Sequence, residues 1–272
     1  MIDLTAFRNI GREQRFIRRN PLIRAFMWLW GPIGIHSRIR AGHVLRVIRQ
    51  LDLPRGAQVL DAGSGHGLVL FSLANSQSEK CLHGIEIDPQ LVAQSQVIAR
   101  LLHLPFVSFE QGDLAMMDTV GGPYDLIFSI DVLEHIQEDV DVLRKFRRSM
   151  NEHGILVLHL PLRHQEQRRI LSVFKNHTVA DHVRDEYLPS EIQEKLAIAG
   201  FRLHSLNYGF GWRGEFAFEL NNLFWWRPRL RATIALLMYP LSWWLAFRDI
   251  NDSPACGNSL IIVAKPATGQ GK

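Results

Sequence analysis

The stretch from Val59 to Gly67 constrains the fold of this chain most, because it places an acidic residue and three closely spaced glycines directly after apolar residues. Its sequence is Val-Leu-Asp-Ala-Gly-Ser-Gly-His-Gly. A strand that ends in Gly-x-Gly-x-Gly turns sharply, and residues without a β-carbon let the backbone come close to a bulky ligand. The stretch therefore predicts a buried strand, a nucleotide-binding loop and a helix over 68–74. Taken alone, the loop fits a glycine-rich turn without a ligand equally well.

The spacing of these glycines differs from that of two common nucleotide-binding loops. A dinucleotide fingerprint runs Gly-x-Gly-x-x-Gly, and a P-loop ends in Lys followed by Ser or Thr. Neither pattern occurs in this loop. Asp61, two residues before the first glycine, would repel a pyrophosphate but can accept hydrogen bonds from an ammonium group. The loop is therefore expected to face the cationic or zwitterionic end of its ligand.

Apolar and amphipathic segments alternate along the chain in the manner of a layered α/β protein. Strands are expected at 57–62, 82–87, 107–110, 124–130, 154–160, 201–208 and 259–265, and helices at 89–102, 138–150 and 189–199. Strands that alternate with helices form a mostly parallel sheet covered on both faces. We therefore predict an α/β fold whose last strand is delayed by an insert of different composition.

The composition is that of a globular protein with a locally basic N-terminus. Of the 272 residues, 47% are hydrophobic, and Cys81 and Cys256 lack metal-type spacing, which favours a reducing compartment. The first 50 residues hold ten arginines and only two acidic residues, although the whole chain has a formal net charge of +4. Arg24 interrupts the apolar part of this segment, and no small-residue cleavage site follows, so we expect no secretory signal and a cytoplasmic location.

Four motifs follow one another at the ends of the first four expected strands. They are the glycine loop, Gly84-Ile85-Glu86-Ile87-Asp88-Pro89, Gly112-Asp113, and the stretch from Tyr124 to His135. In this order they resemble the motifs of the class I S-adenosylmethionine-dependent methyltransferases, and Leu133-Glu134-His135 resembles the turn of the subset that includes ubiquinone-type methyltransferases. The resemblance covers roughly residues 40–212 and the last strand. It implies a transferase with a Rossmann-like, seven-stranded sheet whose last strand is antiparallel.

The resemblance implies S-adenosyl-L-methionine as the cofactor and assigns residues to it. Glu86 matches the acid that binds the ribose hydroxyls, and a carboxylate can accept hydrogen bonds from both of them. Asp113 matches the acid that accepts from the adenine amino group, with Leu114 beside the ring, although Asp113 also suits an ordinary turn. Ser129 is assigned to the same site. The residues expected at the methionine end are Asp61, Gly63, Ser64, Gly65 and Gly67.

A catalytic base is needed if the acceptor is a hydroxyl or an acidic carbon, and histidine suits that role near neutral pH. His135 follows the fourth strand, at the carboxyl edge where ligands bind in open α/β sheets. His135 and Glu134 are therefore candidate catalytic residues, with capping of a helix or bracing of the cofactor loop as the alternative. His182 is a third candidate, because with Arg184 it resembles a segment that lines the acceptor pocket in this subset. The histidines expected to be solvated and without a role are His159, His164 and His177.

A tryptophan-rich insert precedes the last strand. Residues 216–248 contain four of the seven tryptophans, with arginines at the flanks of apolar runs. The longest uncharged run, 232–247, would span only about 24 Å as a helix, which is short of the roughly 30 Å of a bilayer. A full crossing is therefore disfavoured, whereas a shallow helical hairpin at a membrane interface fits. A soluble lid or a homodimer face is the alternative.

These observations divide the chain into three parts. Residues 1–40 form a basic aromatic arm, residues 41–212 and 258–268 form the methyltransferase domain, and residues 213–257 form the apolar helical insert. We expect a small-molecule or lipid acceptor, lipid-like or prenylated, reached by a protein that lies peripherally on the inner face of the membrane. The alternatives are a noncatalytic cofactor-binding module and a methyltransferase of soluble molecules. No nucleic acid partner and no metal site are expected, since the sequence shows no RNA-binding module and no metal-ligand spacing.

Overall fold

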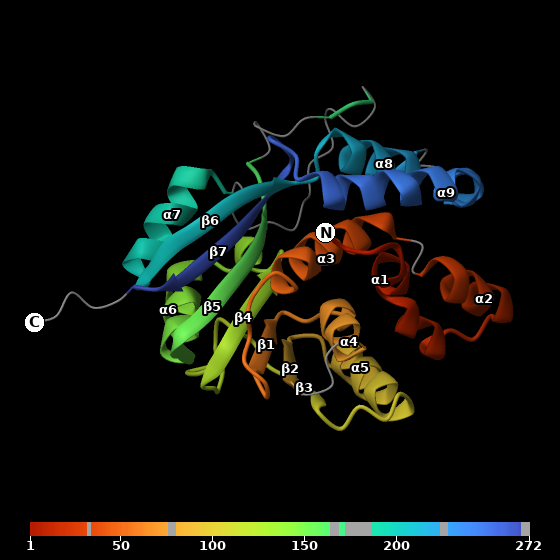
Figure 1. Cartoon of the computed structure of the whole chain (residues 1–272). Helices are drawn as coiled ribbons and strands as arrows, with labels where there is room; N and C mark the ends of the chain where they lie inside the picture. The colour runs from red at the N-terminus through yellow and green to blue at the C-terminus, as the bar shows by residue number, and fades with distance from the viewer. Residues whose placement is uncertain (32–33, 76–79, 164–168, 172–186, 224–227, 268–272) are drawn as a thin grey trace, which may run out of the picture.

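The computed structural model describes residues 1–31, 34–75, 80–163, 169–171, 187–223 and 228–267. A twisted sheet lies at the centre with helices against both faces, and a pair of helices forms a further layer across one edge of it (Figure 1). The described elements follow the expected alternation of strand and helix.

The strands form one seven-stranded sheet in the order β3-β2-β1-β4-β5-β7-β6. Neighbouring strands from β3 to β5 are parallel, and β7 is antiparallel to both β5 and β6. The predicted fold class, a mostly parallel sheet with an antiparallel last strand, is confirmed. The strands are β1 (Gln58–Ala62), β2 (Cys81–Glu86), β3 (Val107–Gln111), β4 (Tyr124–Ile130), β5 (Met150–Pro161), β6 (Phe201–Gly209) and β7 (Ser259–Pro266).

Alternating side chains along the strands build a hydrophobic core on each face of the sheet. Val59 packs on the face covered by α3 (Ile35–Ile48), α4 (Leu68–Ala74) and α5 (Pro89–Leu101). Leu60 packs on the opposite face, which α6 (Asp139–Arg148) and α7 (Pro189–Ile198) cover. Successive side chains of a strand point to opposite faces, so the consecutive apolar residues Val59–Leu60 of β1 and Leu126–Phe128 of β4 suit strands that are covered on both sides.

The N-terminal segment is helical and joins the core through α3. It comprises α1 (Leu4–Asn9), the 3₁₀ helix η1 (Arg12–Ile17) and α2 (Pro21–Trp30). Arg38 of α3 is fully buried and donates hydrogen bonds to the carbonyl oxygens of Phe7 and Trp30, near the ends of α1 and α2. A buried guanidinium is tolerated only when it is hydrogen-bonded in this way. Helix α3 runs across residue 40, where the sequence places the end of the arm, and that division stays a prediction.

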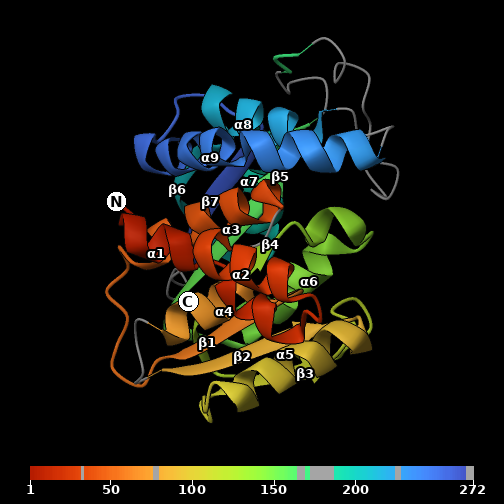
Figure 2. The ribbon, with the colours of Figure 1, turned by 90° about the vertical axis from the view of Figure 1, so that its right-hand side faces the viewer.

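The insert is helical, as predicted, and consists of α8 (Trp212–Asn222) and α9 (Pro228–Asp252). The two helices pack along each other beyond the carboxyl end of β6, and Figure 2 shows them as a layer above α3. Helix α9 continues through Pro240. Within the described part of the chain, no helix has the length and apolar character that a bilayer crossing requires.

Helices α2 and α9, from opposite ends of the chain, are in direct contact. The ring centroids of Phe26 and Tyr239 lie 5.0 Å apart, and those of Trp30 and Trp243 lie 5.8 Å apart. Edge-to-face pairs of this kind stabilise by about 0.5–1.5 kcal/mol beyond the burial of their area. The two aromatic segments recognised in the sequence therefore form one structural unit.

Candidate functional site

The glycine loop follows β1 and contacts the carboxyl end of β2 and the segment after β4. The amides of Gly63 and Ser64 donate to the carbonyl oxygen of Ile85 at 2.8 and 2.9 Å, which ties the loop to the end of β2. Gly63 has a φ of +85°, and a Cβ at this position would collide with the side chain of Val132, just after β4. Both the backbone conformation and the close approach therefore require glycine.

Glu86 holds the same loop from the end of β2. Its Oε2 accepts a hydrogen bond from the amide of Gly65 at 2.7 Å, and its Oε1 accepts one from the amide of Asp88 at 3.0 Å. The residue is 9% exposed. Each carboxylate oxygen has two lone pairs, so Glu86 retains the capacity to accept from ligand hydroxyls. The structure thus brings the predicted ribose-binding acid and the predicted loop into contact.

Asp61, at the end of β1, is only 3% exposed. Burial, and secondly the negative charge of Glu86, raise the pKa of Asp61 well above its ordinary range. A cation beside Asp61 would oppose both effects and favour the ionised carboxylate. Ser64 adds a buried Oγ to which none of the described residues offers a hydrogen bond. Asp61 and Ser64 therefore suit a ligand end that carries both an ammonium group and a hydrogen-bonding partner for a hydroxyl, as the methionine end of the expected cofactor does.

The remaining predicted cofactor residues flank this loop. The carboxylate of Asp113, just after β3, accepts a hydrogen bond from the amide of Ala115 at 2.9 Å, which is the turn geometry considered as its alternative role. Leu114 is buried beside it. Ser129 of β4 is buried and donates from Oγ to the carbonyl oxygen of Ala62 at 2.7 Å, so it holds the start of the loop. Contacts of these residues with a cofactor stay a prediction.

The predicted catalytic residues have different surroundings. Glu134 and His135 belong to the 3₁₀ turn η2 (Leu133–His135) after β4. Glu134 is buried and His135 is exposed. Their part in catalysis stays a prediction. The predicted residues that lie outside the described part of the chain are His182, Arg184, His164 and His177.

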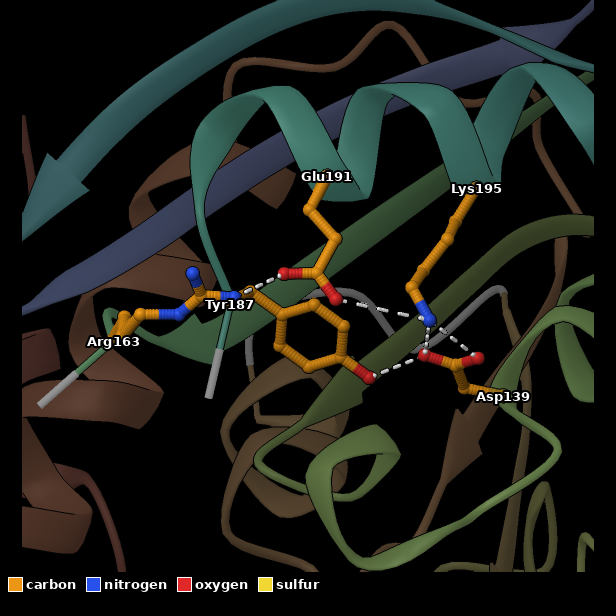
Figure 3. A network of polar contacts seen from close by, with 5 residues as sticks. All are labelled: Asp139, Arg163, Tyr187, Glu191 and Lys195. Atoms are coloured by element: carbon orange, nitrogen blue, oxygen red, sulfur yellow. Dashed lines mark hydrogen bonds and ion pairs between the residues drawn. The ribbon is translucent and has the colours of Figure 1, made fainter. Parts of the chain in front are cut away.

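Polar contacts fix both ends of the segment between residues 163 and 187. Figure 3 shows that Tyr187 donates from its hydroxyl to Asp139 at 2.7 Å, and that Lys195 contacts both oxygens of Asp139, at 3.0 and 2.9 Å. Arg163 pairs with Glu191 at 2.8 Å, and its amide donates to the carbonyl oxygen of Tyr187 at 3.1 Å. The chain therefore departs from the end of β5 and returns beside it, against α6 and α7.

A polar cluster that sequence reasoning missed lies between α3 and the ends of β4 and β5. Asp131, which follows β4, forms an ion pair with Arg40 of α3 and accepts a hydrogen bond from Nδ1 of His159 at 2.7 Å. His159 lies in β5 and is 1% exposed, so the expectation of a solvated histidine is wrong. Burial alone would raise the pKa of Asp131, but Arg40 and His159 outweigh it and hold the pKa well below its ordinary range.

His36 and His43 extend this cluster along α3. With Arg40 they are spaced by four and three residues, which places all three side chains on one face of the helix. The ring of His36 packs against Phe210 and Phe218 at centroid distances of 4.9 and 4.8 Å. Burial lowers the pKa of both histidines, so both favour the neutral form. This helical spacing was the one signal in the sequence that could have identified the cluster.

Comparisons with known proteins agree with this geometry. A family model described as a methyltransferase domain matches residues 53–200, which is more than half of the chain. The ubiquinone biosynthesis O-methyltransferase of Azorhizobium caulinodans is 25% identical over 175 residues, which cover 61% of this chain and 65% of that protein. The trans-aconitate 2-methyltransferase of Methylobacterium nodulans is 28% identical over 115 residues, which cover 42% of each. The chain thus spans less than two thirds of the length of these curated relatives.

A solved structure has the same fold at low sequence identity. Phosphoethanolamine N-methyltransferase 2 of Haemonchus contortus, in complex with S-adenosyl-L-methionine, matches with a TM-score of 0.62 and 15% identity, over 88% of this chain and 57% of that one. At this identity the likeness concerns the fold. In the described part of the chain, no group of three or more His, Cys, Asp or Glu side chains is arranged to hold a metal ion.

Proposed function

This chain belongs to the methyltransferase domain family, and from that premise we propose that it transfers the methyl group of S-adenosyl-L-methionine to a small, lipid-like acceptor. The observation that carries the proposal is the contact between Glu86 and the glycine loop, beside the buried carboxyl of Asp61. A decayed, noncatalytic module would be expected to lose such buried polar groups, since they destabilise a fold that has no ligand to match them.

The residues of the loop fit the separate parts of this cofactor. Asp61 would face the ammonium group, because a cation restores the ionised form that burial disfavours. Ser64 would use its unpartnered Oγ at the methionine carboxylate. Glu86 would accept from the ribose hydroxyls, and Asp113 with Leu114 would contact the adenine. Gly65 and Gly67, which both have positive φ, complete the turn over which the ligand would lie.

The cofactor supplies a methyl group on a positively charged sulfur, so the protein has little covalent chemistry to perform. Its own residues bind and orient the acceptor and exclude water. Val132 lies against Gly63, so the segment after β4 forms one wall of the cofactor loop. Glu134 and His135 follow in that segment and stay candidates for handling the acceptor proton, as does His182.

The lipid-like character of the acceptor is supported by the surfaces of α2 and α9. Leu22 is 78% exposed and Leu237 is 73% exposed, on two helices that contact each other. Trp28 and Trp244 are half exposed on the same helices. Exposed apolar side chains gathered on neighbouring elements favour a partner or a membrane, and arginines beside them favour anionic lipid. The exposed arginines of this region are Arg18, Arg19 and Arg24.

We therefore propose a peripheral position at the inner face of the membrane, from which α2 and α9 contact lipid while the site faces the acceptor. A soluble lid or a homodimer face made of the same residues is the competing explanation. Flotation with anionic liposomes distinguishes them. The wild type should float, and Leu237→Gln combined with Trp244→Ser should not. Leu101→Gln, which changes an exposed leucine of α5, is the matched control and should float like the wild type. Absence of flotation, with a dimer in sedimentation analysis, would replace the lipid surface by a protein interface.

The activity itself is tested in two steps. Calorimetry should show that S-adenosylmethionine binds the wild type and binds Glu86→Gln more weakly. Incubation with radiolabelled S-adenosylmethionine and a membrane lipid extract should then yield a labelled, organic-soluble product. Binding without any labelled product from lipid or soluble extracts would favour the noncatalytic module, and absence of binding would reject both.

A further inference from the structure

His159 presents a buried nitrogen that the fold leaves unsatisfied. Its Nδ1 is hydrogen-bonded to Asp131, but Nε2 is buried and has no hydrogen-bond partner among the described residues. A buried polar atom without a partner is destabilising, because it has lost its hydrogen bonds to water without gaining one in the fold. His43 likewise has a buried Nδ1 without a partner among the described residues, so what distinguishes His159 is this free nitrogen together with its position beside the cofactor loop. The free Nε2 therefore points to a ligand that supplies the missing contact.

The contacts of Asp131 determine which nitrogen of His159 carries the proton. The Asp131 carboxylate can only accept, so the neutral ring must donate from Nδ1, and the lone pair lies on Nε2. Two further contacts fix this arrangement: the amide of Asp131 donates to the carbonyl oxygen of His159 at 3.0 Å, and Arg40 pairs with the other carboxylate oxygen. Asp131 has a φ of +52°, a conformation that costs a non-glycine residue energy and recurs at functional sites.

The pair formed by His159 and Asp131 lies close to the cofactor loop. His159 pairs with Ile130 across β4 and β5, and Asp131 is the next residue after Ile130. Val132 follows and touches the loop at Gly63. His159 therefore lies one strand away from the wall of the loop. On its other side the ring faces Phe210 at a centroid distance of 6.4 Å, so an apolar acceptor would meet an aromatic surface there.

We propose that His159 is the base that takes the proton from a hydroxyl group of the acceptor, with Asp131 and Arg40 as positioning residues. This inference rests on the proposed function and narrows its acceptor to a hydroxylated, apolar molecule. The O–H bond breaks, its electron pair stays on the acceptor oxygen that receives the methyl group, and the proton forms an N–H bond at Nε2. The Asp131 carboxylate faces the resulting imidazolium, which later releases the proton to water.

The chemistry favours a hydroxyl over an amine. A neutral amine is nucleophilic as it is, whereas a hydroxyl gains most of its reactivity when its proton is removed. A histidine base that is hydrogen-bonded to a carboxylate, as His159 is to Asp131, therefore suits methyl transfer to oxygen more than to nitrogen. The pH dependence of His159 will reflect its charged and titratable neighbours as well. Those neighbours are His36, Arg40 and His43 of α3, Asp131 after β4, Asp249 of α9, and Arg169.

The first test uses the tautomer of His159 and needs no acceptor. In protein labelled with ¹⁵N at histidine, the His159 signals are assigned by their loss in His159→Gln. We expect the neutral ring to be protonated at Nδ1 and unprotonated at Nε2. Asp131→Asn should populate the other tautomer. A wild-type ring protonated at Nε2 would overturn the assignment of His159 as the base.

The second test uses product formation from the lipid extract with radiolabelled S-adenosylmethionine. His159→Asn and His159→Gln should lower the rate by about 100-fold or more, the usual contribution of a general base, and the loss should shrink as the pH rises. Affinity for S-adenosylmethionine and thermal stability should stay within about twofold and a few degrees of the wild type. His153→Asn, an exposed histidine at the other end of β5, is the matched control and should leave the rate unchanged.

The outcomes separate the two proposals. A His159→Asn variant with a near-wild-type rate across the pH range would overturn the role of His159 while the methyltransferase activity remains. A wild type that binds S-adenosylmethionine but labels nothing would overturn the proposed function, and a wild-type tautomer with the proton on Nε2 would still reject His159 independently. Labelled products that carry only N-methyl groups would overturn the hydroxyl acceptor.

Discussion

Nε2 of His43 lies 3.0 Å from the carboxylate of Asp249, although 206 residues separate the two in the sequence. The pair joins α3, which packs on the sheet, to α9 of the insert. Both side chains are buried. A Cβ on Gly214 would meet the Asp249 carboxylate at 2.6 Å, so α8 carries a glycine where the pair passes beneath it. The insert is therefore attached to the methyltransferase fold by a specific polar contact as well as by apolar packing.

Loss of the Asp249 carboxylate should weaken this attachment. Asp249→Leu leaves His43 buried without its partner, which should lower the free energy of unfolding by about 1–3 kcal/mol. Urea unfolding measures the change. Asp252→Asn is the control on the same helix, because its contact with Arg213 at 2.6 Å is partly exposed and should contribute about 0–1 kcal/mol. Equal losses in the two variants would show that the buried pair has no special role.

The buried histidines predict how stability depends on pH. Burial lowers the pKa of His36 and of His43, so the folded protein binds protons less readily than the unfolded chain does. As the pH falls below about 6.5, the two histidines bind protons in the unfolded chain but stay neutral in the folded protein. The contribution to stability is thus complete above that pH and is lost as the pH falls. Urea midpoints at pH about 7.5 and 5.5 should differ less in His36→Phe than in the wild type, and an unchanged difference would refute this origin.

The carboxyl group of Asp61 should lower the stability of the ligand-free protein and strengthen its binding of S-adenosylmethionine. Its pKa is raised in the folded protein, so stability is greatest where the carboxyl is protonated and is lost as the pH rises through that raised pKa. Asp61→Asn should therefore raise the melting temperature of the ligand-free protein at neutral pH and weaken binding of S-adenosylmethionine by about tenfold or more. Binding to the wild type should also release protons, which calorimetry in buffers of different ionisation enthalpy detects. A variant that is both less stable and equally able to bind would contradict the assignment.

Substitution of Gly63 and of Gly56 separates two effects of a side chain at positive φ, which are backbone strain and collision with a neighbouring side chain. Both have positive φ, but a Cβ on Gly63 would collide with Val132, whereas a Cβ on Gly56 meets nothing within 4 Å. Each alanine substitution should cost about 1 kcal/mol from the backbone conformation. Only Gly63→Ala should displace the segment after β4 and reduce affinity for S-adenosylmethionine. Equal affinities of the two variants in calorimetry would show that the contact with Val132 does not shape the site.

The fold and the cofactor loop could be predicted because their signals are local. Val59, Asp61 and Gly63 lie within one short stretch, and Glu86 ends the next strand, so the order of strands alone places them at one edge. The antiparallel last strand was anticipated from the resemblance, and the helical insert from its composition.

The spacing of His36, Arg40 and His43 marks one face of α3, but the cluster as a whole could not be predicted, because its members come from three distant elements. Arg40, Asp131 and His159 lie on α3, after β4 and in β5. The arginine-rich N-terminus suggested a basic aromatic arm, and its sequence did not show that Arg38 is buried and bonded to carbonyl oxygens that only the folded α1 and α2 supply. His159 lies in a strand that the sequence did predict, but nothing local distinguishes a histidine with a buried carboxylate partner from one in solvent.

The buried carboxylate of Asp139 in α6 accepts hydrogen bonds from Tyr187 and from Lys195 of α7. Removal of one partner should leave its buried carboxylate short of hydrogen bonds. Lys195→Met should therefore destabilise by about 3–5 kcal/mol, the usual effect of breaking a buried pair. Glu191→Gln, which changes the more exposed contacts with Arg163 at 2.8 Å and with Lys195 at 3.9 Å, should cost about 0–1 kcal/mol. Thermal unfolding compares them, and a smaller loss in Lys195→Met than in Glu191→Gln would contradict the importance of Asp139.

The closure at Arg163 and Tyr187 has a consequence for engineering. Because the backbone returns to within one hydrogen bond of its point of departure, the residues between these two positions can change in number without altering the distance that the rest of the chain must span. Of the residues between them, the structure describes 169–171, which contact Glu215 and Glu219 of α8, so an exchange should keep these three residues. Segments of different length from related transferases, grafted at these two stems, should leave the register of the sheet and of the cofactor loop unchanged.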